Sequence, residues 1–369
     1  MKPMHSISGG RPWPWILALA LCAMCGGAYA DDVEEFLIQD AQQRYFDLPL
    51  DARSLALGGS NIATADDLAT VFGNPAGLGF IDHCGASFTY SRDEINGDEF
   101  PFTNAIGRDY DVGTLRIALP IRMGGTVGFG YSASEGETSD LQDTEVDREL
   151  YNFAYGLRLN PCMSLGYSFT WVQDEVDGRW GDYEMDDGYR HTLGLQCRPS
   201  ACTALGLSGF YASGDPESDI IIIGPQNGDR ESWGVELGGA WQVFERTRLT
   251  SSVDYVSYDL DSNIRLANVP VANLVPADED GQSWTVRAGI EQKCCDWLTG
   301  RVGYLYRDNT YDFKDPILAA NLNDSLDYHA VSTGLGLNIC QNLTVDYGFQ
   351  YRFLGDGDVT NTVTATFHF

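Results

Sequence analysis

Apolar and small or polar residues alternate along most of the chain from about residue 84 onward. The segment 151–159 reads YNFAYGLRL, with aromatic or aliphatic residues at each odd position and small or polar residues at each even position. The segment 343–353, LTVDYGFQYRF, repeats this pattern. Because side chains on a strand point alternately to its two faces, each segment predicts a β-strand with one apolar face.

Fourteen such segments follow one another, each about ten residues long, which is the length of a tilted membrane-spanning strand. Their starts lie near residues 84, 112, 125, 149, 163, 188, 202, 230, 247, 281, 296, 327, 342 and 359. Short connections alternate with long ones, as they do between the two rims of an outer-membrane barrel. A soluble β-sandwich or propeller is the alternative, but it does not explain the alternating loop lengths. We therefore predict an all-β fold, a 14-stranded antiparallel outer-membrane β-barrel over residues 84–369.

The first thirty residues form a separate segment. Lys2 and Arg11 precede a short apolar run over 16–24, and the small-x-small sequence at 28–30 follows. This pattern predicts a signal peptide over residues 1–30. No later run approaches the roughly 18 apolar residues of a spanning helix. We expect export to the outer membrane of a Gram-negative-type bacterium.

The formal net charge is −30, from 23 Lys and Arg against 53 Asp and Glu. This balance argues against a nucleic-acid partner, because no basic excess exists to neutralise phosphates. Acidic residues crowd the long loops, where we expect solvated surfaces, bridged to lipopolysaccharide by divalent cations. The stretch 259–263 begins like a calcium loop, but Ile264 and Pro270 replace the Gly and Glu that such a loop needs. We therefore predict no protein-bound metal site and no cofactor.

Residues 31–83 do not alternate and are rich in small residues, which suits close packing inside a barrel. Within this segment, the run ARSLALGG…ATADDLATVFGNPAGL resembles the N-terminal hatch of FadL-type outer-membrane transporters and of the related PorV-type barrels, most closely over residues 51–80. The most specific part of the resemblance is Asn74, Pro75 and Ala76. The resemblance implies that residues 31–83 are a hatch, or plug, in the lumen.

The resemblance also implies a function: an outer-membrane channel through which long-chain fatty acids or other hydrophobic compounds diffuse. In such transporters a kink in the third strand opens a lateral exit, and here that strand contains Gly128 and Gly130. The third long loop departs from the family because it is short and acidic. The alternative is a PorV-like structural or shuttle role, with exported proteins as partners. If the protein is a channel, its partners are a hydrophobic small molecule and outer-membrane lipids, including lipopolysaccharide.

The long loops contain apolar runs, and exposed apolar patches tend to mark binding sites. One run consists of four consecutive isoleucines, Ile220, Ile221, Ile222 and Ile223. We interpret it as an entrance where a lipid-like ligand is captured. Packing of the loops against one another is the alternative.

The strand faces predicted to line the lumen contain several charged residues. They are Arg116, Arg158, Arg287, Arg301, Arg352, Glu236, Asp254, Glu291 and Asp346. Buried charges need partners, so structural ion pairs are one interpretation. The other is a carboxylate-binding arginine in the transport path. No nucleophile motif surrounds His191 or His329, and we expect no enzymatic activity.

Seven cysteines follow the predicted signal peptide, all at the rim with short turns. Neighbouring strands lie about 4.8 Å apart, close enough for disulfides between adjacent strand ends. We predict two disulfides, each with an open choice of partner. Their cysteines are Cys162 with Cys197 or Cys202, and Cys340 with Cys294 or Cys295.

Overall fold

The computed structural model describes eleven stretches of the chain. They are residues 48–64, 67–95, 108–121, 124–138, 145–178, 181–215, 217–220, 224–262, 279–313, 325–353 and 357–369. The predicted signal peptide and the first part of the predicted hatch, residues 31–47, lie outside them. None of the described helices is long and apolar enough to cross a membrane.

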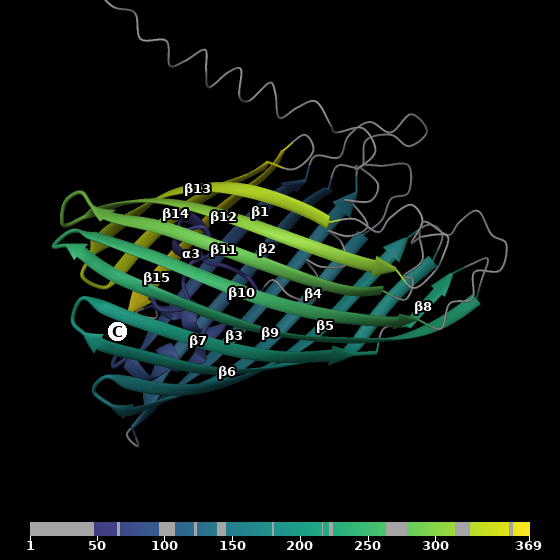
Figure 1. Cartoon of the computed structure of the whole chain (residues 1–369), viewed down its shortest axis with the longest axis horizontal. Helices are drawn as coiled ribbons and strands as arrows, with labels where there is room; N and C mark the ends of the chain where they lie inside the picture. The colour runs from purple at the N-terminus through teal and green to yellow at the C-terminus, as the bar shows by residue number, and fades with distance from the viewer. Residues whose placement is uncertain are drawn as a thin grey trace, which may run out of the picture.

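A single antiparallel sheet closes on itself and forms the molecule (Figure 1). Its strands are β1 (Gly85–Ile95), β2 (Arg108–Ile121), β3 (Gly125–Thr138), β4 (Glu145–Asn160), β5 (Met163–Gly178), β6 (Gly181–Ser200), β7 (Thr203–Gly214), β8 (Glu217–Ile220), β9 (Gly224–Phe244), β10 (Thr247–Ser262), β11 (Glu279–Lys293), β12 (Leu298–Phe313), β13 (Ser325–Cys340), β14 (Leu343–Phe353) and β15 (Asp358–His368). Fourteen long strands make the ring, which closes through the β9–β10 and β1–β15 pairs. The four-residue β8 fills the wall between the outer ends of β6 and β9. The predicted 14-stranded antiparallel barrel is confirmed.

The alternation along each strand separates an outer face from an inner one. On β4, Phe153 is 56 % exposed while its neighbour Asn152 is fully buried in the lumen. Outward aromatic rings contact one another from strand to strand, as in the series Trp233, Tyr255 and Trp284, with centroids 5.4 and 4.7 Å apart. An apolar outer face with an aromatic band is typical of a barrel that faces lipid.

The two rims differ in form. Short turns join the strands at one end, which we call the short-turn rim, and the opposite end is the outer rim. Several strands continue toward the outer rim beyond the aromatic band. The third long loop predicted from the sequence, from Asp174 to Asp187, is mostly strand, because β5 runs to Gly178 and β6 starts at Gly181. Backbone pairing does not need apolar side chains, so the ladder extends past the point where the hydrophobic alternation ends.

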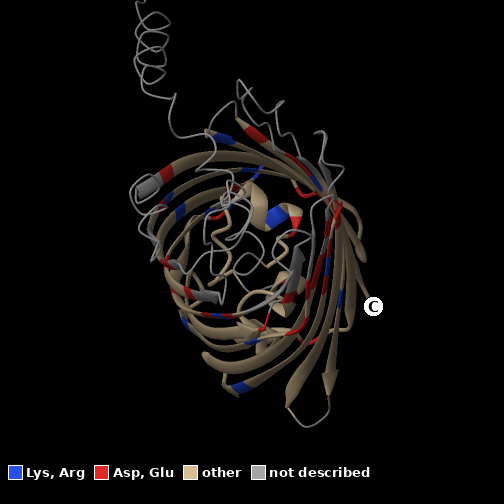
Figure 2. Ribbon diagram, turned by 90° about the vertical axis from the view of Figure 1, so that its right-hand side faces the viewer, with Lys and Arg blue, Asp and Glu red and all other residues tan. Residues whose placement is uncertain are grey.

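The described part of the hatch lies inside the ring (Figure 2). Its first half, residues 48–64, contains α3 (Ala52–Ala56), which begins after Asp51 because that side chain accepts a hydrogen bond from the Ser54 N–H. Its second half, residues 67–83, contains the 3-10 helices η1 (Leu68–Val71) and η2 (Pro75–Phe80). Both halves are buried against the wall.

Candidate functional site

Glycines line the barrel wall at many of the points where the hatch touches it. A Cβ atom added at any of them would lie within 3.0 Å of a hatch atom; they are Gly130, Gly156, Gly166, Gly194, Gly206, Gly238, Gly289, Gly303, Gly334 and Gly348. At Gly156, Gly166, Gly206, Gly289, Gly303 and Gly348 the nearest hatch atom belongs to the main chain, and at the other four it belongs to a side chain. This fit leaves no room for the described hatch to slide along the wall as a rigid body.

The predicted signature residues form the tightest part of this fit. Asn74 caps η2: its Oδ1 accepts from the Ala76 N–H, and its Nδ2 donates to the carbonyls of Ile62 and Leu195. Pro75 occupies the first helical position, where its missing N–H costs nothing. The structure thus brings these three residues together as the joint between the two hatch halves and β6.

Gly128 and Gly130 of β3 face the hatch. A Cβ at Gly128 would meet Leu78 and Val71, and one at Gly130 would meet the ring of Phe72. The strand is paired with β2 and β4 along its whole described length, without a register shift. The glycines therefore accommodate apolar hatch side chains.

A network of ion pairs attaches the first half of the hatch to the opposite wall. Arg53 bridges Asp67 of the hatch at 2.7 Å and Glu291 of β11 at 2.9 Å. Glu291 also accepts from Arg301 at 2.8 Å, and Arg301 donates to Asp346. Of the charges predicted to line the lumen, Glu291, Arg301 and Asp346 are thus joined in a structural network.

The other predicted lumen charges are separate from that network. Arg287 pairs with Asp254 and, at 3.7 Å, with Glu236. Arg352 lies 3.5 Å from Asp358. Arg158 lies exposed at the short-turn rim, over the ring of Phe80. Arg116 is buried beside the hatch and is discussed below.

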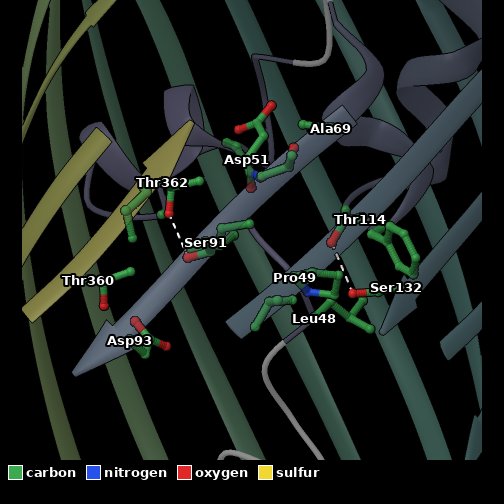
Figure 3. A pocket seen from close by; sticks show the side chains of 18 of the residues that line it. Leu48, Pro49, Asp51, Ala69, Ser91, Asp93, Thr114, Ser132, Thr360 and Thr362 are labelled. Atoms are coloured by element: carbon green, nitrogen blue, oxygen red, sulfur yellow. Dashed lines mark hydrogen bonds between the residues drawn. The ribbon is translucent and has the colours of Figure 1, made fainter. Parts of the chain in front are cut away.

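A cavity of about 330 Å³ lies in the lumen against the hatch, on the side that faces the outer rim. Its floor belongs to the hatch and is mostly apolar, with Leu48, Pro49, Leu50, Leu55 and Phe72 beside the polar Asp51 and Asn61. One wall, on β15, β1, β2 and β3, is lined by hydroxyls that pair with one another, such as Ser91 with Thr362 and Thr114 with Ser132 (Figure 3). The cavity therefore combines an apolar base with polar sides.

Charged side chains line the rest of the cavity, both on the strands that flank this wall, β4 and β14, and across the lumen, and Asp174 and Glu236 are among them. Arg148, Arg190 and Arg307 line the cavity, together with Arg287 and Arg352. The first three were absent from the sequence-based set of lumen charges. The sequence does indicate that they face the lumen, because each lies in the same alternation register as neighbouring lumen residues. They were missed because they lie near the point where the apolar pattern of their strands ends.

The remaining predicted sites have mixed outcomes. Only the backbone of Ile220 is described, at the end of β8, and Ile221, Ile222 and Ile223 lie outside the described residues.

All seven described cysteines border turns or the hatch at the short-turn rim, as expected, but in the structure they are free thiols. The two predicted disulfides are therefore not formed in it. The register gives one reason, because the residue opposite Cys197 is Met163 and not Cys162.

Acidic side chains gather on the strand extensions near the outer rim. Repulsion by Asp186, Glu175 and Glu217 raises the pKa of the Glu184 carboxyl above its usual range. No group of three His, Cys, Asp or Glu side chains suited to a metal ion occurs among the described residues.

The fold matches solved outer-membrane channels, whereas no protein-family model and no curated protein matches the sequence. A Pseudomonas aeruginosa FadL homologue aligns with a TM-score of 0.64 at 13 % identity, over 88 % of this chain and 99 % of that one. The CymD monoaromatic hydrocarbon channel gives 0.60 at 14 % identity, over 88 % and 99 %. The Ralstonia pickettii toluene transporter TbuX gives 0.59 at 12 % identity, over 89 % and 100 %. The resemblance to FadL-type barrels is thus confirmed in the fold.

Proposed function

We propose that this protein is an outer-membrane channel of a Gram-negative-type bacterium, through which hydrophobic compounds diffuse without a cofactor. The observation that carries the proposal is the cavity with an apolar floor, set above a hatch that fits the wall closely. A ligand can enter such a cavity from the outer rim, but it cannot continue straight through the described hatch. Long-chain fatty acids are the finer candidate: the apolar floor would hold the acyl chain, and the carboxylate would share the cavity arginines with their present partners, such as Asp174 at Arg148.

The exit that we propose is lateral, at β3. On the lumen side, a Cβ atom at Gly128 would meet Leu78 and Val71 of the hatch and Ala154 of β4, and one at Gly130 would meet the ring of Phe72. If Phe72 rotates away, the glycine beside it leaves a gap in the lumen lining next to the membrane. The entrance would be the isoleucine run 220–223, where a lipid-like molecule is captured before it reaches the cavity.

The lateral exit is tested by a double substitution that enlarges a wall residue and reduces the hatch residue that it contacts. Gly130→Val alone would displace Phe72, so we combine it with Phe72→Ala, which restores space for the valine. Phe72→Ala alone is the matched control. Uptake of oleate or toluene by cells that lack their own transporter should be retained in the control and fall in the combined variant.

Equal uptake in the two variants would argue against an exit at β3. If the wild-type protein itself moves neither compound, the proposed function is wrong. Heat-modifiable migration on gels must show a folded barrel in both variants, so that loss of uptake is not loss of folding. Native mass spectrometry of the purified protein addresses the secretion alternative, because a bound exported protein in place of a lipid would favour a shuttle role.

A further inference from the structure

The barrel closes where its first and last strands meet, and we call the β1–β15 pair the seam. Thr89 of β1 and Thr364 of β15 lie opposite each other, 275 residues apart in sequence. Most other neighbouring strands are joined by one connection and can pair locally. Because loop closure costs more entropy for distant partners, the seam is the pairing least supported by the chain itself.

A ring of buried hydrogen bonds spans the seam and includes the hatch. Arg116 of β2 donates from Nη1 to the Thr89 hydroxyl at 2.8 Å, and the hydroxyls of Thr89 and Thr364 are 2.9 Å apart. Thr364 accepts from the backbone N–H of Ala52 at 2.9 Å. The second guanidinium nitrogen, Nη2, donates to the Pro49 carbonyl at 2.7 Å. The hatch backbone between Pro49 and Ala52 thus completes a closed circuit across β15, β1 and β2.

The interactions that offset the buried positive charge of Arg116 come mainly from the hatch. Its side chain is 1 % exposed, and the carboxylates that act on it, Asp51 and Asp67, both belong to the hatch. The ring of Phe72, also in the hatch, lies 5.5 Å from its guanidinium carbon. A buried cation without partners is strongly unfavourable, so the wall beside the seam is built for an occupied lumen.

We propose that hatch residues 49–52 act as a clasp that holds the barrel seam closed, with Arg116 as its positioning residue. The hatch then has a structural role that does not depend on any transported molecule. It also follows that the seam closes stably only when the hatch is seated. Hatch seating and barrel closure are therefore coupled steps of folding.

Hydrogen–deuterium exchange of the full-length protein in detergent tests the clasp strand by strand. Thr364→Val keeps the side-chain shape and removes two hydrogen bonds, the one accepted from Ala52 of the hatch and the one shared with Thr89 across the seam. Thr362→Val is the matched control, because Thr362 is equally buried on β15 and pairs with Ser91 across the same seam. Loss of two buried hydrogen bonds predicts roughly thirtyfold faster exchange of β1 and β15 amides in Thr364→Val, against about fivefold for the single bond lost in Thr362→Val, with β6 and β7 unchanged in both. Unchanged protection of the seam in Thr364→Val, or equal acceleration in the two variants, would overturn the proposal.

Arg116→Gln is the stronger variant and can fail to fold, so its test is a rescue. Ser91 and Thr362 face each other across the seam with their hydroxyls 2.7 Å apart. Cysteines at both positions, in a background with the native cysteines changed to serine, should form a cross-seam disulfide under oxidising refolding. Recovery of the folded gel band of Arg116→Gln by this disulfide supports the clasp. Failure of the disulfide to restore folding would place the defect away from the seam and contradict the proposal.

Discussion

Both halves of the hatch fit closely against wall glycines, but within the described residues only the first half adds a network of ion pairs to that fit. The first half is attached through the charge of Arg53, which pairs with Glu291 and Asp67. The second half contacts the wall through uncharged groups: Ser164 and Thr126 donate to hatch carbonyls, and Val71, Phe72 and Leu78 join an apolar cluster with wall residues.

The contrast predicts how each half responds to substitution. The strength of a neutral, sterically fitted contact depends on shape and changes little with pH or salt concentration. A buried ion pair depends on an exact balance of charges, and removing one partner leaves the other uncompensated. We therefore expect the first half to be the more sensitive to substitution, and the following variants measure that difference.

The largest effect should follow from Glu291→Gln. Glu291 accepts from Arg53 and Arg301, and Arg248 lies 3.8 Å away, so neutralising it leaves three arginines around an uncharged amide. Breaking a buried pair in this way costs about 3–5 kcal/mol. The measurement is the urea midpoint of unfolding, with planar-bilayer conductance expected to rise as the first half loosens.

Glu245→Gln is the control for that variant, because Glu245 is exposed in the β9–β10 turn at the short-turn rim. Its effect should stay within about 0.5 kcal/mol. Comparable losses in the two variants would mean that Glu291 is not a hub of the attachment.

A smaller effect is expected from Gly166→Ala, which tests the steric fit of the second half. The added methyl group would overlap the backbone of Pro75 and Ala76, which cannot rotate away. Overpacking of this kind costs about 1–3 kcal/mol. Gly113→Ala on β2 is the matched control, since its Cβ would meet no atom within 4 Å. Equal stability of the two variants would show that the hatch can shift to relieve the contact.

The sequence predicts the barrel well because each strand has an apolar face on the outside of the barrel and a small or polar face toward the lumen, which makes the two residue types alternate. The predicted starts of β3, β5 and β10, for example, agree with the structure to the residue. Strand ends near the outer rim are missed where the apolar alternation stops, as in β6. The Asn74 signature locates the hatch, but nothing local in the sequence indicates that Arg116 binds Pro49, which is 67 residues away.

The same reasoning explains which parts of the candidate site were found. Glu291, Arg301 and Asp346 stand out as charges within strongly alternating segments, whereas Arg148 and Arg190 lie next to acidic stretches that look like loops. Arg53 lies in the hatch, where no periodicity assigns a face. Its pairing with Glu291 depends on how the hatch is seated, and that is a tertiary property.

The smallest effect should come from Ser164→Ala, which removes one neutral tie of the second half. Ser164 Oγ donates to the Ala76 carbonyl at 2.7 Å, and both groups are buried. The loss should be about 1 kcal/mol, because the steric fit of Gly166 and Gly194 keeps η2 in place. Hydrogen–deuterium exchange of peptides covering residues 67–83 measures it, with Ser208→Ala, a cavity-lining serine, as control. If Ser164→Ala loosened the second half more than Glu291→Gln loosens the first, the neutral contacts would be the weaker attachment. The contrast between the two halves would then be reversed.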